Sequence, residues 1–272
     1  MSPNMAPWRK SLEAFFEERG AAVSGRPTLD ELCFIAGRDP RVWRDDATRA
    51  GIAEDITKLT DIGPSTHVLE VGCAAGFLAM LVAPSAARYT GVDVAEAPLK
   101  VARRLGLRNA RFERADGAAL PFPNSAFDGA FCCDVFINLP SIEDGVALVG
   151  EMLRVVKPGR PVLVGNVPDR ARAADLPRRV AEVASAMEAR YGSAPLPPSK
   201  SREGVLQRVR GYFGGVLSAS EIPPMVVTYD FDRSDFERLA DRLGATAAIC
   251  EINKLHPYHG FRFHAVYRTL SQ

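Results

Sequence analysis

Short β-rich runs alternate with helical stretches between His67 and Val167, and this alternation restricts the possible folds more than any other feature of the chain. The predicted strands are, in order, HVLEV, YTGVDV, NARFERAD, FDGAFCC and RPVLVGNV. Helices are predicted in the gaps, over Phe77–Val82, Ala97–Leu105 and Ile142–Val156. Strands joined through helices run parallel and are linked by right-handed crossovers. The sequence therefore predicts an α/β fold with a doubly wound sheet.

The segments on either side of this region complete the predicted organisation. Residues 1–64 form an N-terminal helical segment, with helices from Pro7 to about Arg19 and from Asp46 to about Thr60. Leu12, Phe15 and Phe16 make an apolar stripe on the first helix, which we interpret as packing.

The alternation stops after Val167, and residues 168–225 are interpreted as an inserted helical lid with helices over Leu176–Arg190 and Val205–Phe213. The core, residues 65–167 and 226–272, then resumes with a helix, the strand ATAAICEI and the strand FRFHAVYRTL. Because the short turn KLHPYHG joins these two strands, they must be antiparallel. The prediction is a seven-stranded sheet with an antiparallel last strand.

Composition excludes several classes of partner. Lys and Arg number 34 against 33 Asp and Glu, so no general positive field attracts nucleic acid. No apolar run is long enough to span a membrane or resembles a signal sequence, and a cytoplasmic location is expected. The five cysteines have no spacing suited to zinc, and no metal site is predicted. The oligomeric state is left open.

Three short segments carry the predicted ligand chemistry. VLEVGCAAGFLA places Gly72 and Gly76 in a strand-to-helix turn, where small residues let the backbone approach a nucleoside. GVDVA ends the second strand at Asp93, whose carboxylate can accept hydrogen bonds from both ribose hydroxyls. RADGAALPF places Asp116 after the third strand, within reach of an adenine amine. The alternative is structural: a glycine turn needed only by the fold, and two aspartates that cap helices.

These segments, followed by FDGAFCC and LRVVKPGRPVLV, resemble the class I S-adenosylmethionine-dependent methyltransferases, particularly the ubiquinone and menaquinone methyltransferase-like group, over about Thr66 to Val167. The resemblance implies a Rossmann-like fold, S-adenosylmethionine as cofactor and S-adenosylhomocysteine as product. It implies that Glu70 orders the glycine turn and contacts the methionine amino group through water or backbone, that Asp93 holds the ribose and that Asp116 binds the adenine. The implied cofactor-binding set also contains Gly72, Cys73, Ala74, Gly76, Val94, Gly117 and Cys133. Ala74 departs from the family pattern, which has glycine there.

Candidate acceptor-site residues follow later strands. The turn LHPYHG should emerge on the ligand side of the sheet, which makes His256 and His259 candidate bases and Tyr258 a substrate-binding residue, unless the turn is a solvated hairpin tip. Asp134, after the fourth strand, is a further candidate base, and Asn138 a substrate-binding residue. In the lid, Tyr191 and Tyr212 could bind an aromatic or anionic acceptor.

The predicted function is transfer of a methyl group to an oxygen or nitrogen of a small-molecule acceptor in biosynthesis. The alternatives are carbon methylation and a module that binds the cofactor without catalysis. A dehydrogenase is disfavoured, because the dinucleotide pattern G-x-G-x-x-G would need glycine at Ala74 and Phe77.

Overall fold

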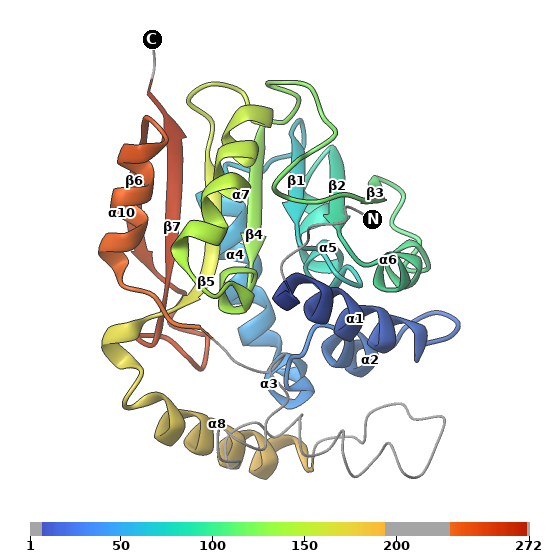
Figure 1. Cartoon of the computed structure of the whole chain (residues 1–272). Coiled ribbons are helices and arrows are strands. Elements are labelled where there is room, and N and C mark those ends of the chain that lie inside the picture. Colours follow the sequence, from blue (N-terminus) through green and yellow to red (C-terminus); the bar gives the residue numbers. More distant parts are fainter. Residues whose placement is uncertain (1–6, 194–228, 271–272) are drawn as a thin grey trace.

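A computed structural model of the chain describes residues 7–193 and 229–270 (Figure 1). The strands are β1 (His67–Val71), β2 (Arg88–Asp93), β3 (Ala110–Arg114), β4 (Gly129–Cys133), β5 (Val162–Pro168), β6 (Ala245–Glu251) and β7 (Arg262–Thr269). The helices are α1 (Pro7–Ala21), α2 (Leu29–Ile35), α3 (Pro40–Arg44), α4 (Asp46–Leu59), α5 (Phe77–Val82), α6 (Glu96–Arg103), α7 (Ile142–Val155), α8 (Leu176–Tyr191) and α10 (Arg233–Arg242).

The described strands form one seven-stranded sheet in the order β3-β2-β1-β4-β5-β7-β6. The pairs among β1 to β5 are parallel, whereas β7 is antiparallel to both of its neighbours, β5 and β6. The doubly wound, Rossmann-like sheet with an antiparallel last strand is therefore confirmed. Since β6 runs with the parallel strands, the turn between β6 and β7 emerges at their carboxyl ends.

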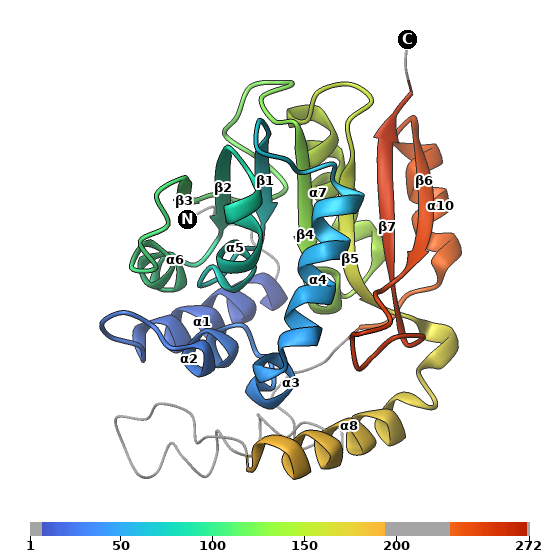
Figure 2. The same cartoon turned by 180° about the vertical axis from the view of Figure 1, so that it is seen from behind.

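Successive residues of the central strands face two different apolar cores. On β1, Val68 packs with α4 and α5, and the next residue, Leu69, packs with α7 and α10 on the opposite face. Both residues are fully buried, as expected for parallel strands covered by helices on both faces. Figure 2 shows α4 crossing the face of the sheet away from α7. This arrangement leaves the carboxyl ends of the strands for other elements to cover.

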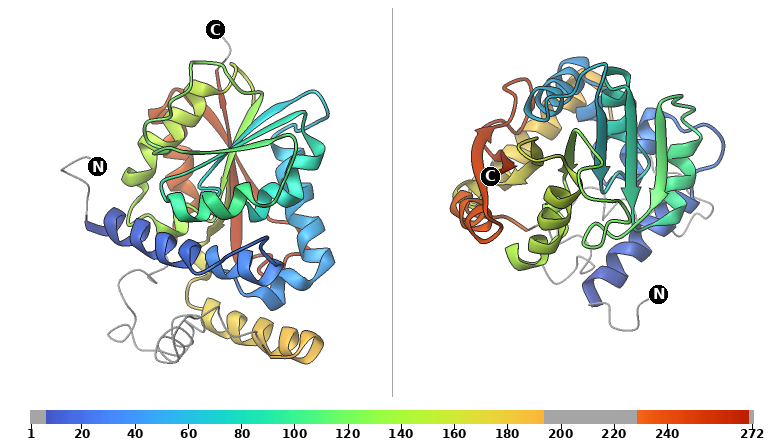
Figure 3. Two further views of the ribbon diagram at one scale, coloured as in Figure 1. Left: turned by 90° about the vertical axis from the view of Figure 1, so that its right-hand side faces the viewer. Right: turned by 90° about the horizontal axis from the view of Figure 1, so that it is seen from above.

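Helices α1, α2, α3 and α8 gather beyond the carboxyl ends of the parallel strands (Figures 1 and 3). The carboxylate of Glu17 on α1 accepts hydrogen bonds from the backbone N–H groups of Glu96 and Ala97, and so caps α6, whose own N-cap residue is Ala95. Gly20 permits the close approach of α1, because a Cβ there would lie 2.4 Å from the backbone nitrogen of Pro98.

Helix α8 is attached to the rest of the molecule near both of its ends. The guanidinium of Arg179 donates to the carbonyl of Pro257 in the β6–β7 turn at 2.9 Å. At the other end, Arg190 pairs with Asp45 at 2.7 Å, and the Tyr191 hydroxyl donates to the same carboxylate at 2.9 Å. Helix α8 agrees with the predicted first lid helix, while the second, Val205–Phe213, lies outside the described residues.

Helices α2 and α3, which are seven and five residues long, were not predicted from the sequence. Both carry a capping signal: Thr28 and Glu31 form a reciprocal capping box at α2, and Asp39 caps α3 just before Pro40. Helices this short contain too few turns to show an apolar period, so only these caps could have revealed them.

Candidate functional site

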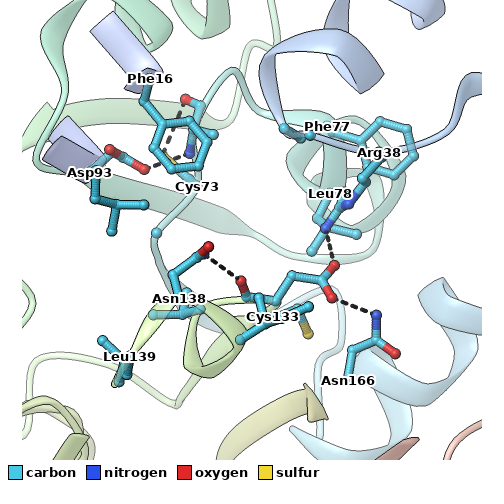
Figure 4. Close-up of a pocket in the computed structure, with 18 of the residues that line it drawn as sticks. Phe16, Arg38, Cys73, Phe77, Leu78, Asp93, Cys133, Asn138, Leu139 and Asn166 are labelled. Atoms are coloured by element: carbon cyan, nitrogen blue, oxygen red, sulfur yellow. Dashed lines mark hydrogen bonds and ion pairs between the residues drawn. The ribbon is translucent and has the colours of Figure 1, made fainter. Parts of the chain in front are cut away.

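A cavity of about 630 Å³ lies at the carboxyl ends of β1, β2, β4 and β5 (Figure 4). Its floor is the strand-to-helix turns of the sheet, and its walls come from α1, from residues 36–43, from α8 and from the β6–β7 turn. This volume is in the range of sites that enclose a cofactor or a drug-sized ligand. The stripe of Leu12, Phe15 and Phe16 on α1 lines this cavity.

The turn between β1 and α5 needs its glycines for two different reasons. Gly72 has φ 78°, and a Cβ there would lie 2.5 Å from the side chain of Val135. Ala74 also takes a left-handed conformation, with φ 44°. Gly76 has φ 78° and begins α5, but it is not among the residues lining the cavity. Gly76 is the N-cap residue of α5, and its assignment to cofactor binding stays a prediction.

Asp93 joins the turn to the end of β2. Its carboxylate accepts a hydrogen bond from the Ala74 backbone N–H at 2.8 Å and one from the Ala95 N–H at 3.0 Å. Burial raises the pKa of Asp93, and the backbone hydrogen bonds oppose this effect. Because each carboxylate oxygen has more than one acceptor position, Asp93 can still accept hydrogen bonds from a diol in the cavity.

Asp116 lines the cavity farther along the sheet, and its side chain is half-exposed. One of its oxygens accepts from the Ala118 N–H at 2.9 Å, and the other pairs with Arg9 of α1 at 3.2 Å. A Cβ at the next residue, Gly117, would lie 2.7 Å from Val71. The remaining predicted cofactor residues at the cavity wall are Glu70, Cys73, Ala74, Val94 and Cys133.

Glu70 is a buried carboxyl group at the cavity floor. The hydroxyl of Tyr89 donates a hydrogen bond to its Oε2. Burial raises the pKa of Glu70 to about 7, although the Tyr89 hydrogen bond and the charge of Arg38 act in the opposite direction. Glu70 therefore changes charge near neutral pH.

A partly buried ionic cluster occupies the other half of the cavity, and we name it the Asp134 cluster: Asp134, Arg38, Arg262 and Asn166. Arg38 pairs with Asp134 Oδ2 at 2.8 Å, Arg262 pairs with Oδ1 at 2.9 Å, and the Asn166 amide donates to Oδ1 at 2.6 Å. Figure 4 shows Arg38 and Asn166 approaching one carboxylate from two sides. The two guanidinium charges hold the pKa of Asp134 below its usual range despite burial. Both oxygens are occupied, so this geometry disfavours Asp134 as a base.

His256 lines the cavity with only 3% of its surface exposed. Its Nδ1 accepts a hydrogen bond from the Tyr258 N–H at 3.1 Å, so the neutral ring carries its proton on Nε2. Burial, together with the charges of Arg262 and Arg38, lowers the pKa of His256 to about 3. This arrangement disfavours His256 as a base and makes its Nε2–H a donor.

The other predicted acceptor-site residues divide into two groups. Tyr258 and Asn138 line the cavity; the Asn138 amide donates to the Asp134 carbonyl at 3.1 Å. His259 and Tyr191 are not among the described residues that line the cavity, and their assignments stay predictions. His259 Nδ1 lies 2.6 Å from the Ile252 carbonyl, and Tyr191 is turned towards Asp45. Tyr212 lies outside the described residues.

Sequence reasoning missed four residues of this half: Arg38, Trp43, Asn166 and Arg262. The Arg38 guanidinium lies 4.6 Å from the Phe77 ring centroid and 5.0 Å from that of Trp43. Only Asn166 had an available signal, because it sits near the end of a predicted core strand, where site residues collect.

In residues 7–193 and 229–270, no group of three His, Cys, Asp or Glu side chains is arranged to hold a metal. Within these ranges no helix is long and apolar enough to cross a membrane.

The chain is similar to several known proteins. Residues 68–159 match a family model described as "Methyltransferase domain". The chain is 31% identical over 113 residues to a ubiquinone biosynthesis O-methyltransferase of Hahella chejuensis, covering 38% of this chain and 44% of that protein. It is 29% identical over 176 residues to nodulation protein S of Rhizobium tropici, covering 61% and 73%. The matches span 40–54% of the length of the first three curated relatives.

Solved structures share the fold at low identity. Magnesium protoporphyrin IX methyltransferase of Synechocystis, with bound S-adenosylhomocysteine, has a TM-score of 0.54 at 15% identity, covering 97% of this chain and all of that one. Phosphoethanolamine N-methyltransferase 1 of Haemonchus contortus, in complex with phosphoethanolamine and S-adenosylhomocysteine, has a TM-score of 0.59 at 11% identity. It covers 97% of this chain and 49% of that one.

Proposed function

We propose that this chain transfers the methyl group of S-adenosylmethionine to an oxygen or nitrogen of a small molecule. The premise is that residues 68–159 form a class I S-adenosylmethionine-dependent methyltransferase domain. One observation carries the proposal: a single cavity joins the glycine turn and Asp93 to the Asp134 cluster, so two ligands can meet inside it. The relatives named as O-methyltransferases favour oxygen as the acceptor atom.

The residues of the first half suit an adenosine with an amino-acid tail. Asp93 would accept hydrogen bonds from the ribose hydroxyls, Asp116 from the adenine amine, and Glu70 would face the methionine ammonium. Gly72 and Gly117 lie where a Cβ would collide with neighbouring side chains, so the backbone at this floor is kept free of side chains. When bound, S-adenosylmethionine supplies an electrophilic methyl group.

The chain's own contribution to the reaction would be positioning. Methyl transfer requires the acceptor atom in line with the breaking bond, and enclosure of both reactants supplies much of the rate enhancement. Helices α1 and α8 would exclude water from the two sides of the cavity. Since Asp134 and His256 are both poor proton acceptors in this geometry, we expect the acceptor to be one that loses its proton easily or binds already deprotonated.

Titration calorimetry with S-adenosylmethionine, S-adenosylhomocysteine and NAD tests the first part of the proposal. We expect micromolar binding of the two sulfur nucleosides and none of NAD. Incubation with methyl-labelled cofactor and a panel of phenols, carboxylic acids and amines then tests transfer. Absence of nucleoside binding would refute the proposal, while binding without transfer to any acceptor would favour a non-catalytic module.

A further inference from the structure

Three apolar side chains on α1 face the cavity and are not used by the apolar cores. Leu12, Phe15 and Phe16 line the cavity, and each of them is only partly buried. In the part of the chain that the structure describes, the two clusters that pack on the faces of the sheet include none of the three. Their spacing places them on one face of the helix. Because an apolar helix face normally packs against a core, this face is available to a ligand in the cavity.

Polar contacts at three successive turns hold α1 across the ends of β2 and β3. Arg9 pairs with Asp116, just after β3, at 3.2 Å. Glu13 pairs with Arg114, the last residue of β3, at 2.6 Å. One turn farther along, Glu17 accepts hydrogen bonds from the first backbone N–H groups of α6, which follows β2. The helix therefore crosses the strand ends that the proposed function assigns to the ribose and the adenine.

Phe16 faces the part of the cavity that is assigned to the ribose. In Figure 4 its ring projects from α1 into the cavity, on the side of Asp93 and Cys73. The neighbouring ring of Phe15 meets Phe16 edge to face, with centroids 5.3 Å apart. The guanidinium of Arg19 lies 4.1 Å from the centroid of Phe15 and holds that ring in place. Phe15 thus supports Phe16 from within the helix.

A nucleoside presents two kinds of surface to such a site. Its hydroxyl and amine groups lie at its edges, where Asp93 and Asp116 can accept hydrogen bonds. The faces of its base and sugar are largely apolar, and such faces pack on aromatic and aliphatic side chains. The strand ends supply the carboxylates, and α1 supplies the apolar side chains. The two walls are therefore complementary to different parts of one molecule.

We propose that Leu12 and Phe16 of α1 form a second wall of the cofactor site and pack against the nucleoside part of bound S-adenosylmethionine. The inference rests on the proposed function, and it extends the cofactor site to a helix outside residues 68–159, which match the family model. Since neither of the described cores includes the two side chains, they add little to the stability of the free protein. Their contribution should appear when the cofactor binds.

Phe16→Ala tests the inference, with Phe122→Ala as its matched control. Phe122 is also partly buried, but it packs on Phe127 with ring centroids 5.0 Å apart and is not among the described residues that line the cavity. Calorimetry measures the affinity for S-adenosylhomocysteine, and urea denaturation without ligand measures stability. Phe16→Ala should weaken binding by about fivefold or more, the lower end for stacking of a base on an aromatic ring. It should lower the urea midpoint less than Phe122→Ala does, whereas Phe122→Ala should change the affinity less than twofold.

Further variants and a second ligand sharpen the test. Leu12→Ala should also weaken the binding of S-adenosylhomocysteine, and Phe16→Tyr, which keeps the ring, should retain the wild-type affinity. Methylthioadenosine, which lacks the amino-acid tail, should lose as much affinity in Phe16→Ala as S-adenosylhomocysteine does, because the contact is with the nucleoside.

Three results would overturn the inference while the proposed function stood. They are an unchanged affinity for S-adenosylhomocysteine in both Phe16→Ala and Leu12→Ala, a fall of the urea midpoint in Phe16→Ala as large as in Phe122→Ala, and a loss of affinity confined to the ligand with the amino-acid tail. If the wild-type chain itself failed to bind S-adenosylhomocysteine, the proposed function would fall, and the inference with it. The two failures are therefore distinguishable on the wild-type chain alone.

Discussion

Calorimetric titration of S-adenosylhomocysteine at pH 6 and pH 8, in buffers of different ionisation enthalpy, tests whether Glu70 couples cofactor binding to proton release. The pKa of Glu70 is raised to about 7 from an ordinary value of 4.5, chiefly by burial. A methionine ammonium placed beside this carboxyl would favour its ionised form and lower its pKa again. Binding should then expel the proton that the free protein holds.

The expected proton release follows from a return of the Glu70 pKa from about 7 in the free protein to its ordinary value of 4.5 in the complex. At pH 6 a carboxyl with a pKa of about 7 is roughly 90% protonated, so binding should release about 0.9 proton, falling to about 0.1 at pH 8. The same linkage makes S-adenosylhomocysteine bind about tenfold more tightly at pH 8 than at pH 6, equivalent to about 1.4 kcal/mol. Glu70→Gln should abolish both the proton release and this pH dependence, whereas Glu237→Gln on the exposed face of α10 should leave them intact.

The free energy of unfolding should fall between pH 6 and pH 8, whereas the affinity for S-adenosylhomocysteine should rise. Because the folded pKa lies above the unfolded value, the contribution of Glu70 to the free energy of unfolding is fully present below about pH 4.5 and is lost as the pH rises through about 7. The loss amounts to about 3 kcal/mol for a shift of this size. Chemical denaturation of the wild type and Glu70→Gln at pH 5 and pH 8 measures it. The role of Glu70 would be refuted if ligand binding released no proton at pH 6, or if the pH dependence of S-adenosylhomocysteine binding were unchanged in Glu70→Gln.

Three further outcomes are expected. Asp93→Ala should weaken S-adenosylhomocysteine binding at least tenfold in calorimetry, because the carboxylate also holds the Ala74 N–H of the turn; an unchanged affinity would show that the ribose lies elsewhere. Glu17→Ala should lower the free energy of unfolding in urea by about 1 kcal/mol, since it removes the cap of α6, and a loss no larger than that of Glu237→Gln would contradict this role. Alkylation of the folded protein should modify Cys250 first, because the other four cysteines are buried; peptide mass spectrometry that found Cys133 modified earlier would contradict the burial pattern.

The strands and longer helices could be predicted because each leaves a local signal. The five core strands are short β-rich runs bounded by turn residues, and α4, α7 and α10 combine an apolar face with capping residues. The antiparallel last strand also followed from the sequence alone. The turn KLHPYHG between the last two strands is shorter than the dozen or so residues that a crossover between parallel strands needs.

The cofactor half of the cavity was likewise accessible from the sequence, while the acceptor half was not. Parallel strands bring their carboxyl ends to one edge of a sheet, so residues that follow those strands are placed together by topology. Glu70 was assigned only through the family resemblance, whereas that rule located Asp93, Asp116 and Asp134. It could not assign what each carboxylate contacts, and it suggested Asp134 as a base where the structure gives it two guanidinium partners.

The succession of strands and helices along the chain, and the local turns between them, were thus determined by the sequence, because apolar periodicity and turn chemistry act between near neighbours. The pairing of Arg38 with Asp134 spans 96 positions, and that of Arg262 with Asp134 spans 128. Contacts at such separations depend on how α1 to α3 and the β6–β7 turn fold over the sheet, which no local pattern encodes. Only the tertiary structure brings these charges into one partly buried cluster, because a carboxylate shielded from water is stabilised there by the guanidinium groups beside it.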